Sequence, residues 1–264
     1  MNQVNHDQIR QNVRNRYKEI AIQDVGGGNC CTPSDNLGES LADVSSKMGY
    51  SSEELSAVPE GANLGLGCGN PQAIAALQPG EVVLDLGSGG GFDCFLASRQ
   101  VGDLGRVIGV DMTPEMINRA RENAQKNGFK NTEFRLGEIE HLPVRDHSVD
   151  VIISNCVINL SPSKQQVLNE AFRTLRSGGR LAISDVVTTT ELPVEIKKDI
   201  DRVYSGCISG ASSINELESM LEKSGFINIT IESKDESRAF IKNWIPGANV
   251  EQYLVSASIC AIKP

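Results

Sequence analysis

The chain has 264 residues and a formal net charge of −9, and no cluster of basic residues is longer than a pair such as Lys197-Lys198. Because an acidic surface repels polyanions, we expect no nucleic acid among its partners. Residues 1–24 lack an apolar leader, and no stretch approaches the roughly 18 apolar residues of a membrane span, so we expect a cytoplasmic protein without a membrane partner. The length suffices for one large domain with extensions.

The first predicted elements are helical. Apolar residues at helical spacing predict a helix over residues 6–21, and the capping pair Ser51 and Glu54 predicts a short helix that ends at Val58-Pro59. A glycine-rich loop follows over residues 61–71. We therefore expect an N-terminal extension of helices and loops over residues 1–70. It carries three cysteines, Cys30, Cys31 and Cys68.

From Val82 onward, predicted strands alternate with predicted helices. The strands lie near residues 82–86, 106–111, 132–136, 149–154 and 179–187, and the helices near residues 92–101, 114–127 and 163–176. This alternation predicts a doubly wound α/β fold with right-handed crossovers. A helix over residues 214–224 and strands near residues 226–232 and 253–262 complete a mostly parallel, seven-stranded sheet.

A glycine turn directly after the strand 82–86 predicts a ligand site. Glycine tolerates positive φ angles and lets bare backbone approach a ligand. A dinucleotide fingerprint needs a further glycine where this chain has Phe92, which weighs against NAD. Asp85 followed by glycine at every second position (Gly87, Gly89, Gly91) instead resembles motif I of the S-adenosylmethionine-dependent methyltransferases. An ordinary glycine turn after a core strand is the alternative.

A second acid strengthens this interpretation. Asp111 ends the strand 106–111, and in a βαβ unit that position lies beside the glycine turn, where a carboxylate can accept both ribose hydroxyls of a nucleoside. The alternative is that Asp111 only caps the helix beginning near Pro114, although Thr113 could do so unaided. We favour the ribose-binding role.

The seven cysteines are not expected to form static disulfides in a reducing compartment. They are candidates for core residues, reactive thiols or soft ligands. Cys94 and Cys260 lie in apolar runs, where a core role is expected.

Three other thiols occupy more exposed predicted positions. Cys156 follows the strand 149–154, at the sheet edge where ligands bind. Cys68 and Cys207 each lie beside glycines in a loop, and we expect those glycines to let the thiol reach out rather than pack. Soft thiolates select thiophilic ions, so thiols from three distant segments predict a sulfur-only trigonal site.

In chain order these motifs resemble those of the arsenite S-adenosylmethionine methyltransferases. The most specific is Ser154-Asn155-Cys156-Val157-Ile158-Asn159-Leu160; the others are the run 85–94, Asp111-Met112-Thr113, Gly137-x-Ile139-Glu140 and the glycine-flanked Cys68 and Cys207. The resemblance implies a class I methyltransferase, Rossmann-like fold. Residues 71–190 would form the S-adenosylmethionine-binding core, and residues 191–264 would complete the sheet and carry Cys207 as an arsenic-binding elaboration.

The resemblance also implies residue roles. Cys156 and Cys207 bind trivalent arsenic, Cys68 is the third thiol, and Cys30 or Cys31 is an N-terminal redox partner. The implied cofactor-site residues are Asp85, Gly87, Ser88, Gly89, Asp111, Met112, Ile139, Glu140 and Asn155. Leu66 stands where many family members carry tyrosine, which puts an aromatic contact to the cofactor from that loop in doubt.

The function implied is methylation of arsenite, bound as a thiolate complex, with S-adenosylmethionine as methyl donor, and thereby arsenic detoxification. The implied partners are arsenite or its thiol complexes and a thiol reductant, either thioredoxin or a small thiol. Two alternatives stay open. A methyltransferase of a small organic acceptor needs the glycine turn but not Cys68 and Cys207, and a non-enzymatic metalloid-binding protein needs the thiols but not the glycine turn.

Overall fold

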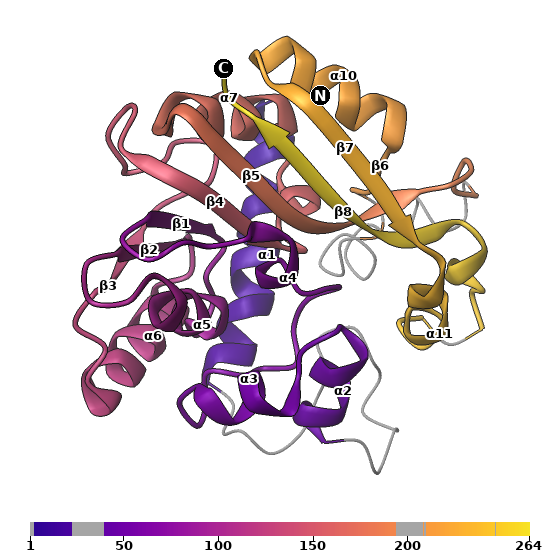
Figure 1. Cartoon of the computed structure of the whole chain (residues 1–264). Coiled ribbons are helices and arrows are strands. Elements are labelled where there is room, and N and C mark those ends of the chain that lie inside the picture. The colour runs from indigo at the N-terminus through magenta and orange to yellow at the C-terminus, as the bar shows by residue number, and fades with distance from the viewer. Residues whose placement is uncertain (1–2, 23–39, 194–207, 209, 246) are drawn as a thin grey trace.

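The structure is a computed structural model of the chain and describes residues 3–22, 40–193, 208, 210–245 and 247–264. Figure 1 shows a twisted central sheet with helices on both faces. The strands lie side by side in the order β3 (Thr132–Leu136), β2 (Arg106–Asp111), β1 (Val82–Leu86), β4 (Val149–Asn155), β5 (Leu175–Thr188), β8 (Leu254–Ile262) and β7 (Ile227–Lys234).

The sheet is parallel over its first five strands, and β8 runs antiparallel to both β5 and β7. The predicted doubly wound, mostly parallel sheet is therefore confirmed. A short eighth strand, β6 (Ser212–Ser213), also pairs with β5. One boundary was wrong: β5 already begins at Leu175, which pairs with Val149, so the preceding helix ends two residues earlier than predicted.

Alternating residues of the strands pack into two hydrophobic cores, one on each face of the sheet. On one face Leu84 and Leu86 pack with residues of α7 (Lys164–Thr174) and α10 (Ile214–Ser224). On the other face Val83 packs under α4 (Gln72–Ala75), α5 (Phe92–Val101) and α6 (Pro114–Asn127). Strands buried on both faces read as unbroken apolar runs, which is why their positions could be predicted.

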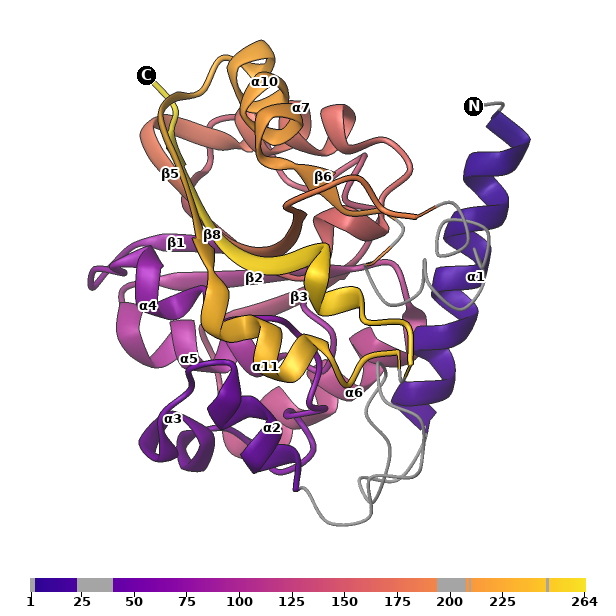
Figure 2. The same ribbon diagram turned by 90° about the vertical axis from the view of Figure 1, so that its right-hand side faces the viewer.

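The remaining elements lie around this central layer. They are α1 (Gln3–Ile22), α2 (Leu41–Lys47), α3 (Ser52–Ala57), η1 (Ile158–Leu160), η2 (Asp235–Ser237), α11 (Arg238–Ile241) and η3 (Val250–Gln252). Figure 2 shows α1 standing along one side of the molecule. Among the described residues, no helix combines the length and apolar character that crossing a membrane requires.

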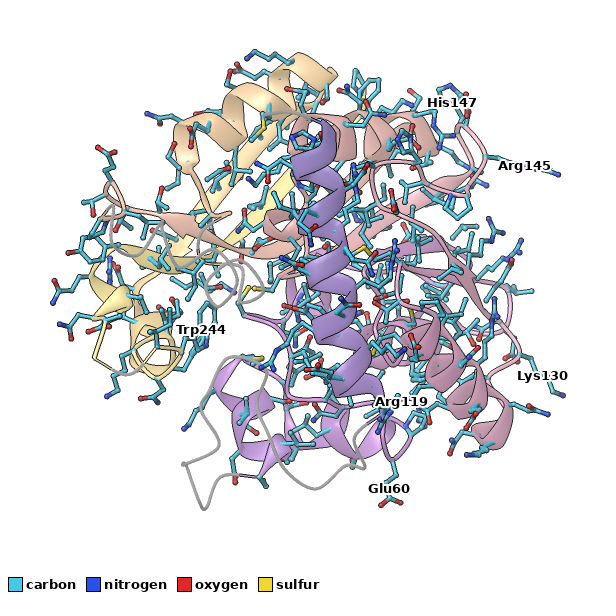
Figure 3. The ribbon with its side chains drawn as sticks, turned by 180° about the vertical axis from the view of Figure 1, so that it is seen from behind. Glu60, Arg119, Lys130, Arg145, His147 and Trp244 are labelled. Carbon is cyan, nitrogen blue, oxygen red and sulfur yellow. The ribbon has the colours of Figure 1, made fainter. Side chains whose placement is uncertain are left out.

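Helix α1 is fixed to the core at its C-terminal end. The Arg119 guanidinium, on α6, donates to the Ala21 carbonyl and to the Gly61 carbonyl, each at 2.9 Å. Figure 3 labels Arg119 beside the end of this helix. Because cationic groups satisfy the unpaired carbonyls of a last helical turn, Arg119 holds α1 and the loop after α3 together.

Candidate active site

The glycine turn forms the floor of a pocket at the carboxyl ends of the strands. Gly87 and Gly89 have φ angles of 73° and 49°, in the left-handed region. A Cβ at Gly87 would lie 2.5 Å from the Val157 side chain, whereas one at Gly89 would meet nothing within 4 Å. Gly87 therefore permits close packing against the segment after β4, and Gly89 leaves open space.

Asp111, at the end of β2, holds this turn in place. Its carboxylate accepts the Gly89 N–H at 3.0 Å and the Thr113 N–H at 2.8 Å. Burial raises the pKa of Asp111, although both backbone hydrogen bonds favour the charged form. The Asp111 carboxylate thus holds both the glycine turn and Thr113, the residue that precedes α6. Its oxygens have further lone pairs that can accept hydrogen bonds from a ligand.

All nine residues predicted for the cofactor site line this one pocket. They are Asp85, Gly87, Ser88, Gly89, Asp111, Met112, Ile139, Glu140 and Asn155. Cys156 lines it as well. The pocket therefore extends from the glycine turn to the first of the predicted arsenic-binding thiols.

Helix α1 closes one side of the pocket, which the sequence did not reveal. Arg10, Val13 and Tyr17 line the pocket. The Arg10 Nε lies 3.3 Å from Oε1 of Glu140, which also accepts the Ser161 hydroxyl at 2.7 Å. Figure 3 shows α1 running along the near side of the molecule in that view. The only signal was the helical spacing of apolar residues, which predicts a buried stripe without saying what it covers.

A buried polar network lies at the other end of the pocket. The Tyr50 hydroxyl donates to Asp93 Oδ1 at 2.8 Å, and the Asn155 amide donates to the Tyr50 oxygen at 3.0 Å. Burial raises the pKa of Asp93 to about 6, against the effect of these hydrogen bonds. Burial and the charge of Asp93 also raise the pKa of Asp85 well above its usual range. A cationic ligand placed beside these two acids would favour their charged forms and lower both pKa values.

Asn155 also fixes the loop that carries Cys68. Its Oδ1 accepts the Cys68 N–H at 3.0 Å, and its Nδ2 donates to the Gly69 carbonyl at 2.8 Å. A Cβ at Gly67 would lie 2.7 Å from the Asn155 amide, and one at Gly69 would lie 2.8 Å from the Ser184 hydroxyl. The glycines beside Cys68 therefore permit close packing of the loop against β4 and β5.

This corrects the expectation that the Cys68 thiol reaches out of its loop. Cys68 is only 1% exposed, and it belongs with Cys156 to an apolar cluster that includes Leu160 and Val186. Cys156 adopts a φ of 60° just after β4, a left-handed conformation that is uncommon outside glycine. That turn carries the chain from the end of β4 into the segment containing Val157.

The two thiols converge on an acid that sequence reasoning missed. One ligand atom from each of Cys68, Cys156 and Asp185 lies within 4.8 Å of the others. Burial raises the pKa of Asp185 to about 6. The available signal was an acid in the mostly apolar segment 181–187 at the carboxyl end of β5, the position from which ligand-binding residues project.

The other cysteines divide into two groups. Cys94 is fully buried and donates to Asp85 Oδ2 at 3.2 Å, so its core position is confirmed. Cys260, on β8, is half-buried rather than part of the core. Cys30, Cys31 and Cys207 lie outside the described residues.

S-adenosylmethionine fits the residues of this pocket. Its sulfonium and ammonium charges suit a wall that carries Asp85 and Asp93, and the Asp111 carboxylate, a group that can accept hydroxyl hydrogen bonds, lines the same pocket. The buried Ser88 hydroxyl has no hydrogen-bond partner among the described residues, which leaves it available to a ligand. The space above Gly89 could admit one.

Comparison with known proteins agrees with this fold. Residues 77–225 match the family described as a methyltransferase domain. A solved arsenic (III) S-adenosylmethionine methyltransferase from Chlamydomonas reinhardtii is 32% identical and covers 83% of this chain and 73% of its own, with a TM-score of 0.63. The chain is therefore an S-adenosylmethionine-dependent methyltransferase of the class I fold.

Two curated relatives define the family more narrowly. An arsenite methyltransferase from Halobacterium salinarum is 52% identical over 98% of this chain and 67% of its own length. One from Aquipseudomonas alcaligenes is 41% identical over 83% of this chain and 62% of its own length. The chain thus spans about two thirds of the length of these relatives. It belongs to the arsenite methyltransferase family.

Proposed function

We propose that this chain methylates trivalent arsenic, with S-adenosylmethionine as the methyl donor, giving methylarsenicals and S-adenosylhomocysteine. The observation that carries the proposal is the double position of Cys156. This residue lines the predicted cofactor pocket and also lies against Cys68. A thiol-bound arsenic atom at Cys156 would therefore be next to the space where the donor methyl group is expected.

The chemistry follows from the donor set. Thiolates replace the hydroxyls of arsenite and leave arsenic with a lone pair, so no general base is needed to create the nucleophile. Methyl transfer is an in-line displacement, in which alignment by Cys68 and Cys156 supplies most of the rate acceleration. The positive charge of the sulfonium disappears in the transition state, and apolar neighbours such as Val157 and Leu160 suit that loss of charge.

The remaining thiols would complete the cycle. We assign Cys207 as a third arsenic ligand and Cys30 or Cys31 as a redox partner. Methyl transfer leaves arsenic formally pentavalent, and two thiolates that close a disulfide return two electrons to it. A thiol reductant, thioredoxin or a small thiol, then reopens that disulfide, as expected in the reducing cytoplasm.

This proposal assigns a role to each part of the chain. Residues 71–190 bind the cofactor, while residues 1–70 and 191–264 supply the remaining thiols around it. The physiological result would be arsenic detoxification.

Arsenic speciation after incubation with arsenite, a thiol and labelled S-adenosylmethionine tests the proposal. We expect labelled methylarsenicals that depend on arsenite. Label transferred to a small organic acceptor instead would identify a different methyltransferase. Failure to bind S-adenosylmethionine, with arsenite binding intact, would identify a non-enzymatic metalloid-binding protein. Mass spectrometry of quenched single turnovers tests the redox step, since a fully reduced protein after product formation would rule out the disulfide.

A further inference from the structure

We propose that Cys68, Cys156 and Asp185 also bind a divalent thiophilic cation of the zinc type, with the Asp185 carboxylate as the third protein ligand. The proposal builds on the proposed function because the same two thiols would serve both ligands. It adds a second class of ligand and gives Asp185 a role that arsenic binding by three thiolates does not require.

The spacing of the three side chains suits a small cation. Their ligand atoms all lie within 4.8 Å of one another. In a tetrahedral zinc site, bonds of roughly 2.3 Å to sulfur and 2.0 Å to oxygen place the ligand atoms about 3.5 to 3.8 Å apart. A contraction of about 1 Å, within reach of side-chain rotation, would bring the three atoms to that spacing.

The carboxylate is already held in a fixed orientation. Asp185 Oδ1 accepts the Asn159 amide at 2.8 Å and the Val186 N–H at 2.8 Å. The Asn159 amide also donates to the Val186 carbonyl at 2.6 Å, and Asn159 is only 1% exposed. Ligating carboxylates are typically oriented by such outer partners. Oδ2 accepts the Asn159 N–H at 3.4 Å, and a hydrogen bond from the Ile158 backbone also favours the charged form of this carboxylate.

The number of donors required distinguishes the two classes of ligand. Three thiolates complete the coordination of trivalent arsenic, so Asp185 is not needed as a direct ligand in that complex. A divalent cation held by two thiolates still has open coordination positions and can take the Asp185 oxygen as a further donor. Sulfur donors favour zinc or cadmium over magnesium and calcium, which require mostly oxygen ligands.

Competition follows from the shared thiols. A bound cation occupies the lone pairs of Cys68 and Cys156 that arsenite needs, so zinc should inhibit methylation competitively with arsenite. Asp185→Asn, which preserves the shape of the side chain, should relieve that inhibition because it removes the charged oxygen donor.

Cadmium titration of the full reduced chain, without arsenite or cofactor, tests the site directly. The titration uses a background in which Cys30, Cys31 and Cys207 are replaced by serine, and it follows the ultraviolet thiolate-to-cadmium absorption. We expect one cadmium ion per chain, held by two thiolates, and competition by zinc. Asp185→Asn should raise the cadmium dissociation constant about tenfold or more. Cys260→Ser, a thiol on the outer part of the sheet, should leave it unchanged.

Three results would overturn the inference. They are no binding in this background, an unchanged affinity in Asp185→Asn, or an unchanged affinity in Cys68→Ser. Cadmium NMR of the unmutated chain reports the number of sulfur ligands and so tests the site even if a variant fails to fold. A chain that methylates arsenite but binds no cadmium refutes this inference alone, whereas one that binds cadmium but methylates no arsenite refutes the proposed function alone.

Discussion

Replacement of Asn155 by alanine should separate thiol positioning from general stability. Asn155 ends β4, and its side chain bonds to two backbone groups of the loop that carries Cys68: Oδ1 accepts the Cys68 N–H, and Nδ2 donates to the Gly69 carbonyl. Alanine removes both contacts and also the bond to the Tyr50 hydroxyl. The loop that carries Cys68 then loses its attachment to the strand that precedes Cys156.

The size of the effect can be worked out from these bonds. A buried donor or acceptor left without a partner costs about 1 to 3 kcal/mol. Two backbone groups lose their partner here, so Asn155→Ala should lower the free energy of unfolding by about 2 to 5 kcal/mol, allowing for partial relaxation of the loop. The spacing between Cys68 and Cys156 should widen, because the loop then loses two of its hydrogen bonds to β4, while the Ser256 hydroxyl still donates to the Cys68 carbonyl.

A matched control removes the same type of side chain elsewhere. Asn131 donates to the carbonyls of Ser98 and Gly102, at 3.2 and 2.9 Å, and accepts the Ser98 hydroxyl. It precedes β3, at the edge of the sheet opposite the pocket. Asn131→Ala should therefore lower stability to a similar extent without touching the thiols.

Urea unfolding and the binding of a trivalent arsenical to the reduced chain measure the two effects. We expect both variants to lose stability, and only Asn155→Ala to raise the dissociation constant of the arsenical by tenfold or more, which corresponds to about 1.4 kcal/mol. An unchanged dissociation constant in Asn155→Ala, or an equal increase in Asn131→Ala, would refute the positioning role.

Three further outcomes follow from the pocket. Asp111→Ala should weaken S-adenosylmethionine binding by about 1.5 to 3 kcal/mol in calorimetry, the scale of a hydrogen bond to a charged acceptor, while arsenite binding stays nearly intact. Cys156→Ser should abolish arsenite methylation, because a hydroxyl is too hard to replace a thiolate ligand, whereas Cys260→Ser should retain it. Burial raises the pKa of Asp93 to about 6 in the folded chain. Protonated Asp93 therefore adds to the free energy of unfolding at a pH below the pKa that Asp93 has in the unfolded chain. That contribution is lost as the pH rises through about 6. Asp93→Asn should therefore remove up to about 3 kcal/mol of the pH dependence of unfolding between about pH 4 and pH 7, and an unchanged dependence in denaturant titrations would count against the raised pKa.

The central elements could be predicted because their signals are local. The bounds of β1 and β2, Val82–Leu86 and Arg106–Asp111, agree with the sequence prediction, as do those of α6, Pro114–Asn127. Buried parallel strands are apolar throughout, and α6 begins with a proline and ends before a glycine. The short elements α4 and α11 were not predicted, since four residues are too few to show helical periodicity.

Only the pocket residues that lie at or just after the ends of strands could be predicted from the sequence. Motif order places Asp85, Asp111 and Asn155 at one edge of the sheet, since the carboxyl ends of parallel strands meet there. The contribution of α1 depends instead on where a separate helix docks. The contact between Arg10 and Glu140 joins residues that are 130 positions apart, and no local pattern encodes it.

The loop around Cys68 shows why the same residues can support two opposite interpretations. Glycines on both sides of a cysteine are compatible with an exposed, mobile thiol and equally with a loop packed too closely for any Cβ. The sequence contains the glycines but not the surfaces they face, which are the Asn155 amide and the Ser184 hydroxyl. Because both surfaces belong to strands that end at the pocket, close packing places the Cys68 thiol beside Cys156 and away from solvent. Burial of this kind suits a site that must exclude water from a thiol-bound ion. The loop can pack this closely only because Gly67 and Gly69 have no Cβ.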